Sequence, residues 1–480
     1  MTTFGAELKL APLSLKAETL HTRDSPRSLF VKVHEEFENA FLLESAIGAK
    51  RLAEYSFIGF EPQTIVRVKD GELSAKSLDG TRDHVKTEDP LQDLRRLIAS
   101  QGSRDLAKRS PFRFIGGAVG YISYDSVRYW ERVPSKAKDD LLLPDMEFGI
   151  YTDGIVFDHL KKGIHYYSLG REDRLAQVEA LLRRRAEQSR GVLSAPNRAK
   201  PTVEKERFEA MVETAKEHIT MGDIFQVVLS KRYDFELRGD LSKFYEALSQ
   251  INPSPYMYFL KFGERRIIGS SPEMLVRVEN RQVETFPIAG TRPHLPDRKE
   301  NAKLTKEMLA DPKERAEHVM LVDLARNDVG RVAKYGSIKV PELLTVQQFS
   351  HVQHIVSRVV GTLREEFDSF DSMRAMFPAG TVSGAPKPRA MEIIDELEPV
   401  RRGPYAGALG YFSFNGNADF AITIRTLVAR GSRCSIQSGA GIVADSDPEK
   451  EWHETESKAA GLMRAVERAT GRRLIGGGKK

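Results

Sequence analysis

Strand-like runs in this chain come in pairs with helical segments between the pairs, and this arrangement limits the fold more than any other feature of the sequence. Beyond Glu204, the segments Met274–Val278, Ala408–Phe414 and Ala421–Leu427 each combine β-branched, aromatic and other apolar residues over the length of a strand. Phe57–Phe60 has the same character in the first part of the chain. Antiparallel strands can follow one another directly, whereas parallel strands need a long crossover after each strand. The sequence therefore predicts an α+β fold rather than a doubly wound sheet.

A polar segment interrupted by a glycine and a proline divides the chain into two parts. This segment, residues 189–198, follows an Arg- and Leu-rich helical segment at about 171–187. The chain has 480 residues, more than one hydrophobic core usually serves. We therefore expect an N-terminal lobe over residues 1–190 and a C-terminal lobe over residues 204–475.

Composition narrows the possible partners and compartments. The net charge of +5 is small for 480 residues and gives no argument for nucleic-acid binding. Cys434 is the single cysteine, which excludes an internal disulfide or a cysteine-built metal site and suits a reducing compartment. Met1–Gly5 lacks the start of a signal peptide, and no apolar run is long enough to cross a bilayer. We expect a cytoplasmic enzyme that binds neither nucleic acid nor a membrane.

Two pairs of glutamates are candidates for binding a divalent cation. Glu314 and Glu317 lie three residues apart, as do Glu451 and Glu454, and this spacing places both members of a pair on one face of a helix. Mg²⁺ prefers oxygen ligands and keeps positions for water and an anionic substrate. Two such faces across a cleft can hold one Mg²⁺, although an isolated pair of this kind is more often solvated helix surface.

The segment Ser438–Ala444 matches the pattern Gly-x-Gly-x-x-Ala. A dinucleotide-binding motif opens directly into a helix. Here Asp445 and Ser446 intervene before a predicted helix with Asp447 as N-cap and Pro448 as its first residue. Glycine amides that bind a carboxylate, and a tight turn without a ligand, both fit this segment better.

Two further segments carry candidate functional side chains. Thr381–Met391 is a loop of small residues followed by a helix, and its amides and the Thr381 hydroxyl can contact an anion. His354 lies in an apolar, strand-like segment, where a buried imidazole can transfer protons. A hydrogen-bonded core histidine is the alternative for His354.

Several ordered segments resemble the signatures of the chorismate-utilising enzymes, and the resemblance covers nearly the whole chain. It implies two large, mostly antiparallel sheets packed face to face, with helices outside. The segments are Gly222–Ser230, Gly269–Glu273, Pro287–Arg292, Leu321–Asp328, Gly380–Lys387 and Ser438–Gly441.

Two variable positions place the chain within this family. Ala289 stands where aminodeoxychorismate synthases typically have a lysine, and Gln226 stands where isochorismate and salicylate synthases have a lysine base that activates water. A side-chain amide cannot deprotonate water, but it can hold ammonia. The chain is therefore most similar to the large components of anthranilate synthases, which convert chorismate and ammonia to anthranilate and pyruvate in the first committed step of tryptophan biosynthesis.

The resemblance also implies roles for individual residues. Mg²⁺ would bind Glu317 and Glu454, with Glu314 and Glu451 in support, and would hold the ring carboxylate of chorismate. Glu273 would protonate the departing C4 hydroxyl. The implied catalytic residues are His354, Glu273, Gln226 and Thr381, and the implied substrate-binding residues are Arg425, Tyr405, Gly439, Ala440, Gly441, Lys458, Ala289, Gly290 and Thr291.

Ammonia would come from a separate glutamine amidotransferase subunit. Glutaminase chemistry needs a nucleophilic cysteine with a nearby histidine. Cys434 has no such context and is predicted to lie in a strand. Without that subunit, we expect the chain to take its ammonia from ammonium salts and not from glutamine.

Two distant segments resemble the tryptophan feedback site of this family. They are Leu42–Ser45 and Asn252–Tyr258. Glu44 and Ser45 would bind the ammonium group of L-tryptophan. The indole pocket would be formed by Pro255, Tyr256 and Met257, joined by Tyr411.

Two alternatives remain from the sequence. The nearest is component I of an aminodeoxychorismate synthase, which stops before pyruvate is lost. A non-catalytic, tryptophan-sensing subunit belongs to a different class, and the candidate residues Glu273, Glu317, His354, Arg425 and Glu454 count against it.

Overall fold

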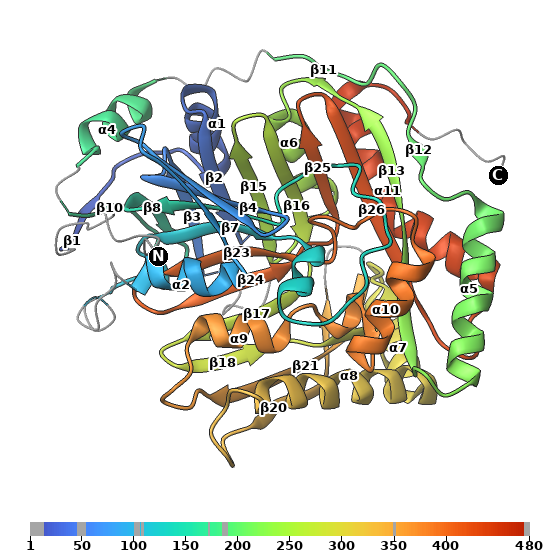
Figure 1. Ribbon diagram of the computed structural model, residues 1–480. Coiled ribbons are helices and arrows are strands. Elements are labelled where there is room, and N and C mark those ends of the chain that lie inside the picture. The colour runs from blue at the N-terminus through green and yellow to red at the C-terminus, as the bar shows by residue number, and fades with distance from the viewer. Residues whose placement is uncertain are drawn as a thin grey trace.

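The computed structural model contains two large sheets packed face to face, with helices on their outer faces (Figure 1). It describes residues 14–45, 54–99, 106, 110–170, 173–184, 191–348 and 352–474. Each large sheet has 12 strands, and neighbouring strands in both run antiparallel. The predicted α+β fold with two antiparallel sheets is confirmed.

The first sheet combines strands from both ends of the chain. Its central contact is between β2 and β15, where Glu44 lies opposite Met257. Its strands in spatial order are β1 (Leu15–Thr19), β10 (Gly163–Leu169), β9 (Asp153–Asp158), β3 (Tyr55–Phe60), β2 (Asn39–Glu44), β15 (Tyr256–Phe262), β16 (Arg265–Ser271), β25 (Thr426–Arg430), β26 (Arg433–Ile442), β13 (Gln226–Glu236) and β12 (Lys200–Pro201), with β22 (Gly384–Ala385) beside β13.

The second sheet is built in the same mixed way, with β7 from the first part of the chain paired to β23 from the last. Its strands in spatial order are β19 (Ile288–Pro293), β21 (Val352–Thr362), β18 (Gln282–Thr285), β17 (Met274–Glu279), β24 (Ala418–Ile422), β23 (Ala408–Ser413), β7 (Gly117–Ile122), β8 (Met146–Tyr151), β4 (Thr64–Lys69), β5 (Glu72–Ser77) and β6 (Arg82–Lys86), with β20 (Lys339–Gln348) beside β21. A separate small sheet pairs β11 (Leu193–Ser194) with β14 (Arg238–Gly239).

The helices complete two hydrophobic cores. One core lies between the sheets and includes Phe114, Phe148 and Phe412, and the other lies under helices on the first sheet and includes Phe30 and Leu462. The helices are α1 (Pro26–Glu36), α2 (Pro90–Ala99), α4 (Leu175–Arg183), α5 (Lys205–Thr220), α6 (Ser242–Ile251), α7 (Arg298–Ala310), α8 (Pro312–Gly330), α9 (Ser369–Met376), α10 (Lys387–Leu397) and α11 (Pro448–Thr470), with short 3₁₀ turns η1 (Tyr124–Tyr129) and η2 (Gly380–Val382).

No helix in the described ranges combines the length and the apolar character needed to span a membrane.

The predicted strand Ala421–Leu427 is wrong as a single element. β24 ends at Ile422 in the second sheet and β25 begins at Thr426 in the first. Arg425 between them has a φ of 52°. Residues other than glycine adopt this left-handed backbone conformation at a cost in free energy. Thr423, Arg425 and Thr426 interrupt the apolar residues of this run, but the interruption is too short for composition alone to reveal that the chain changes sheets there.

A second change of sheet lies beside the first. The chain leaves β16 at Ser271 and enters β17 at Met274, with Glu273 between them. Ile422 N donates to Glu273 O at 3.0 Å, and Ser270 N donates to Arg425 O at 3.1 Å. The two connections, hereafter the paired crossovers, therefore bring Glu273 and Arg425 to the same place between the sheets.

Candidate active site

Glu273 is a buried acid at the paired crossovers. Thr381 on η2 donates its hydroxyl to Glu273 Oε1 at 2.8 Å. Burial raises the pKa of Glu273 to about 7, while the Thr381 hydrogen bond and the charge of Lys458 oppose the rise. A cavity extends from Glu273 and Thr381 toward Leu321 and Asp328 of α8. A carboxyl with this pKa can hold a proton near neutral pH and give it to a leaving group.

His354 lies on β21, opposite Thr291 of β19. Its Nδ1 lies 2.9 Å from Gly290 O and 3.1 Å from Thr291 Oγ1. A carbonyl oxygen only accepts hydrogen bonds, so Nδ1 carries the proton and Nε2 is the basic nitrogen. Burial lowers the pKa of His354, and the charge of Arg425 lowers it further. A neutral imidazole of this kind can act as a base at neutral pH.

The β19 residues Ala289, Gly290 and Thr291 form one edge of the site. The register of β19 against β21 shifts between Ala289 and Thr291, and Gly290 has a φ of 63°. A Cβ on Gly290 would lie 3.1 Å from Glu314 Oε2. Gly290 therefore lets β19 approach α8 closely.

The glycine-rich segment Ser438–Gly441 belongs to β26 and is neither a turn nor a nucleotide loop. Gly439 and Gly441 lie opposite Ser230 and Val228 of β13. A Cβ on Gly439 would lie 2.8 Å from Tyr405 Oη, and a Cβ on Gly441 would lie 2.7 Å from Gln226 Nε2. The glycines thus make room for the side chains of Tyr405 and Gln226 over the strand, with the buried Ala440 between them. The predicted helix start at Asp447 and Pro448 is confirmed.

Two cations lie beside this strand. Lys458 of α11 donates to Gly439 O at 2.9 Å and pairs with Glu454 Oε1 at 2.7 Å. Burial lowers the pKa of Arg425, although Tyr405 and Glu454 oppose that effect. Both cations therefore face the same region as the predicted glutamates, and they can bind an anionic ligand there.

The four candidate glutamates lie on the two predicted helices, α8 and α11. Burial and the charges of Glu314 and Glu454 raise the pKa of Glu317, so α8 and α11 face each other here. Burial also raises the pKa of Glu451, and its Oε2 is buried without a hydrogen-bond partner. Carboxylates that repel one another and a buried oxygen without a partner are donors that suit a hard cation.

These glutamates do not form a closed metal cage. Across the described ranges, no three Asp, Glu, His or Cys side chains lie close enough together to hold a metal ion. Arg292 pairs with Glu314 at 2.8 Å, so one of the four carboxylates already has a cationic partner. No pattern in the sequence predicts this pair, because Glu314 becomes a neighbour of Arg292 only through the packing of β19 on α8. The donors fit a Mg²⁺ that takes most of its ligands from water and substrate.

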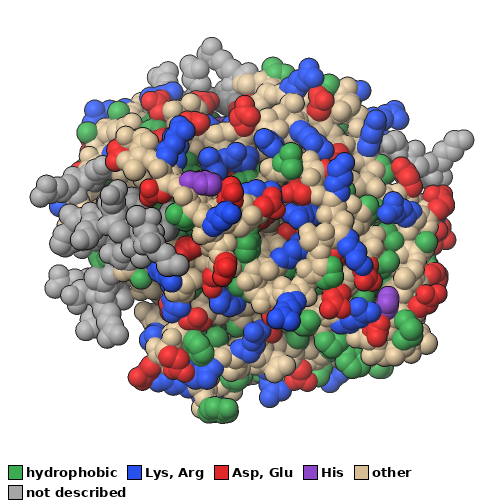
Figure 2. Space-filling view, in the orientation of Figure 1, with side chains coloured by type: hydrophobic (Ala, Val, Ile, Leu, Met, Phe, Trp, Pro, Cys, Tyr) green, Lys and Arg blue, Asp and Glu red, His purple; other side chains and the backbone are tan. Residues whose placement is uncertain are grey.

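Charged side chains of both signs lie on the surface and also within this site. Figure 2 shows acidic and basic side chains interspersed over the face of the molecule seen in Figure 1, without a continuous patch of one sign. The site, in contrast, brings the buried Glu273 together with the half-buried Glu317, Arg425 and Lys458. Electrostatic interactions are stronger there than at the surface.

The six residues of the predicted tryptophan site lie on two sides of the first sheet. Glu44 accepts hydrogen bonds from Arg27 Nε at 2.9 Å and from Tyr245 Oη at 2.8 Å. Met257, opposite Glu44, packs in the core under the helices, and Ser45 and Pro255 adjoin these two strands. Between the sheets, Tyr256 donates to Asp419 at 2.9 Å, and the buried Tyr411 packs against Phe114.

Comparison with known proteins gives the class of this protein. A family model described as a chorismate binding enzyme matches residues 90–464. The chain belongs to this family of chorismate-binding enzymes.

The sequences of relatives match this chain over nearly its full length. The anthranilate synthase component 1 of Methanothermobacter thermautotrophicus is 49% identical over 471 residues, covering 98% of this chain and 97% of that protein. The protein of the same name from Aquifex aeolicus is 43% identical and covers 95% of this chain and 94% of its own length.

Two solved structures have the same fold. Anthranilate synthase component I from Streptococcus pneumoniae superposes with a TM-score of 0.75 at 38% identity, covering 85% of this chain and 92% of that one. The isochorismate synthase MenF from Escherichia coli has a TM-score of 0.71 at 20% identity over 95% of both chains, which shows a shared fold alone.

His318 connects α8 to β21. It follows Glu317 on α8, is fully buried, and lies with Nε2 2.6 Å from Ser357 Oγ on β21. Burial lowers its pKa to about 4. The unfolded chain binds a proton on this imidazole below about pH 6.5, but the folded protein does so only near pH 4. Neutral His318 therefore contributes stability that is present above pH 6.5 and lost as the pH falls toward 4.

We expect the wild-type protein to lose roughly 3 kcal/mol of unfolding free energy relative to His318→Gln between pH 6.5 and pH 4. Urea unfolding of both proteins across this range measures the difference. His21→Gln, at an exposed histidine, is the control and should keep a constant difference from wild type. A pH-independent difference for His318→Gln would show that the imidazole does not titrate as its burial predicts.

Proposed function

We propose that this chain is the chorismate-binding component of an anthranilate synthase. It combines chorismate with ammonia and releases anthranilate, pyruvate and water. The names and near-complete coverage of the relatives support this reaction. The reaction is a carbon–oxygen lyase step that commits chorismate to tryptophan.

The proposal rests on the residues at the two variable positions, neither of which is a lysine. Gln226 is buried over Gly441, and Ala289 stands on β19 beside the strand of His354. An amide cannot remove a proton from water, so a nucleophile that is already basic is required. Ammonia meets that requirement.

The chain's own residues supply binding and proton transfer. Arg425, Tyr405 and the β26 glycines hold the enolpyruvyl carboxylate, and Lys458 adds positive charge. Glu273 gives its proton to the C4 hydroxyl, which leaves as water while ammonia forms the new bond at C2. His354 Nε2 then removes the C2 proton as the enolpyruvyl group departs, and the ring becomes aromatic. Mg²⁺ bound between Glu317 and Glu454 would supply Lewis acidity toward the ring carboxylate.

The ammonia source is a partner subunit. The number in the relatives' names implies a second component, and we assign glutamine hydrolysis to it. Cys434 is buried on β26, and burial raises the pKa of its thiol to about 12. Such a thiol is not a nucleophile at neutral pH.

We also propose that L-tryptophan inhibits the chain at the cluster around Glu44. A buried carboxylate beside Ser45 is a partner for an amino-acid ammonium group. The adjoining strand supplies Pro255 and Met257 for the indole.

Product analysis with chorismate, Mg²⁺ and ammonium tests the function, and His354→Ala tests the proposed final step. Wild type should release fluorescent anthranilate and pyruvate. His354→Ala should bind chorismate but lower anthranilate formation by about 10²- to 10⁴-fold, the usual range for a lost acid or base, with the amino intermediate accumulating. His21→Ala should match wild type. If the wild-type chain released aminodeoxychorismate without pyruvate, it would be component I of an aminodeoxychorismate synthase. If it did not convert chorismate at all, it would be a non-catalytic regulatory subunit.

Glu317→Gln tests the metal site. The substitution keeps the size of the side chain but removes a charged ligand, so the Mg²⁺ concentration for half-maximal turnover should rise at least about tenfold. Asp323→Asn on the exposed face of the same helix should leave the Mg²⁺ dependence unchanged. Equal Mg²⁺ dependence of Glu317→Gln and wild type would remove Glu317 from the site.

Ser45→Leu tests the tryptophan site. The bulky side chain should block the ammonium subsite, so turnover without tryptophan should stay within about twofold while the inhibitory concentration rises at least about tenfold. Ser194→Leu, at an exposed serine on β11, is the control for a general effect of leucine. Inhibition that persists unchanged in Ser45→Leu would place the regulatory site elsewhere.

A further inference from the structure

A buried ion pair lies behind the candidate active site and takes no part in the chemistry proposed above. Arg402 and Glu398 are 2% and 4% exposed. Arg402 Nε donates to Glu398 Oε2 at 2.9 Å, and Arg402 Nη2 donates to Glu398 Oε1 at 2.6 Å. The two residues belong to the segment that leads from α10 to Tyr405.

The guanidinium of Arg402 also holds two backbone carbonyls from different parts of the site. Nη1 donates to Val382 O and Nη2 donates to Val228 O, each at 2.7 Å. Val382 follows Thr381, whose hydroxyl holds Glu273. Val228 lies two residues after Gln226 on β13. One planar cation therefore connects the Thr381 loop to the strand of Gln226.

Glu398 extends the connection along β13. Its Oε1 accepts hydrogen bonds from both the amide and the hydroxyl of Ser230 at 2.8 Å. Ser230 lies opposite Gly439 in the β13–β26 ladder, as Val228 lies opposite Gly441. The ion pair thus holds β13 at the two positions that support the glycines of β26.

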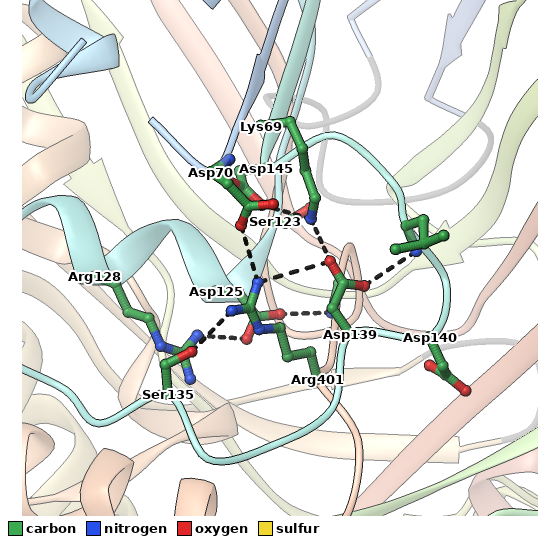
Figure 3. A network of polar contacts seen from close by, with 12 residues as sticks. Lys69, Asp70, Ser123, Asp125, Arg128, Ser135, Asp139, Asp140, Asp145 and Arg401 are labelled. Atoms are coloured by element: carbon green, nitrogen blue, oxygen red, sulfur yellow. Dashed lines mark hydrogen bonds and ion pairs between the residues drawn. The ribbon is translucent and has the colours of Figure 1, made fainter. Parts of the chain in front are cut away.

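The outer side of the same segment is held by the polar network of Figure 3. Arg401 donates to Ser135 Oγ at 2.8 Å and pairs with Asp70 and Asp139. Asp125 accepts a hydrogen bond from Gly403 N at 2.8 Å. With Arg401 fixed outside and Arg402 fixed inside, the segment has little freedom to shift.

Stability alone does not explain this arrangement. Replacing a buried ion pair by apolar residues is often neutral or stabilising, because desolvation offsets the attraction between the charges. Arg402 makes four hydrogen bonds in fixed directions, and its guanidinium lies 5.7 Å from the ring centre of Tyr405. A planar fork of donors sets distances and angles that an apolar contact cannot set.

We propose that Arg402, held by Glu398, is a positioning residue that fixes the acid side and the carboxylate-binding side of the site relative to each other. The inference rests on the proposed function, because its readouts are those of chorismate turnover. Loss of the Val382 contact releases the Thr381 loop and Glu273, which lowers kcat. Loss of the Val228 and Ser230 contacts lets β13 shift, and with it the paired glycines of β26. The carboxylate of chorismate is then bound less well, which raises KM.

Arg402→Lys and Arg402→Met test the role. Lysine keeps the charge opposite Glu398 but cannot reach both carbonyls with one planar group. We expect kcat/KM for chorismate with saturating ammonium to fall on the order of 100-fold in Arg402→Lys, the effect of a shift of about 1 Å in a site. Both kcat and KM should change, and tryptophan binding measured by calorimetry should not.

Arg232→Met is the matched control, since Arg232 is an equally buried arginine on β13 that pairs with Asp140 and Asp234 away from the site. It should lose thermal stability but keep kcat/KM per folded molecule within about threefold. The double variant Glu398→Gln/Arg402→Met should recover stability relative to Arg402→Met without recovering kcat/KM.

These variants distinguish a positioning role of Arg402 from a role in stability alone. A folded Arg402→Lys with wild-type kcat/KM overturns the positioning role. So does a double variant in which activity returns together with stability, because the pair would then be only structural. If Arg402→Met fails to fold, Arg402→Lys and the double variant still distinguish a positioning role of Arg402 from a purely structural one. Absence of anthranilate from the wild-type protein is a different result, which rejects the proposed function itself.

Discussion

The paired crossovers are the constraint on which the rest of the structure depends. The connection from β16 to β17 runs from the first sheet to the second, and the connection from β24 to β25 runs back beside it. The two are joined by the hydrogen bonds from Ile422 N to Glu273 O and from Ser270 N to Arg425 O. A backbone that bends between two packed sheets must satisfy its polar groups locally, and these two hydrogen bonds do so. The bend also places a carboxylate and a guanidinium between the sheets, where water is largely excluded. Fold and site are therefore set by the same few residues.

The electrostatics of the site follow from this burial. A carboxylate with a single hydrogen bond from Thr381 and a distant lysine is poorly solvated, so Glu273 holds its proton near pH 7. The imidazole of His354 loses its proton for the same reason. An acid that keeps its proton and a base that lacks one coexist at neutral pH, as a reaction that needs both requires.

Local signals in the sequence predicted much of the fold, and tertiary packing decided what they missed. The start of α11 followed from Asp447 and Pro448, and the strands β3 and β23 followed from their composition. The change of sheet at Arg425 did not, because buried strands with apolar residues lie on both sides of a very short connection. Most of the candidate site came from resemblance to family segments. The Arg292–Glu314 pair and the Arg402–Glu398 framework arise from packing between segments, which no local pattern records.

The mixed origin of both sheets has a consequence for how the protein is made. Ile115 N donates to Ser413 Oγ across 298 residues of chain, and β7 pairs with β23 in the same region. At about 5 to 20 residues per second, the ribosome needs roughly 15 to 60 s to deliver the second partner after the first. Throughout that time the edge of β7 that will pair with β23 has no partner strand, although its other edge can pair with β8, and unpaired edges invite association between chains. The nascent chain should therefore need protection by chaperones until its last strands emerge, and it should fold as one unit after synthesis rather than lobe by lobe.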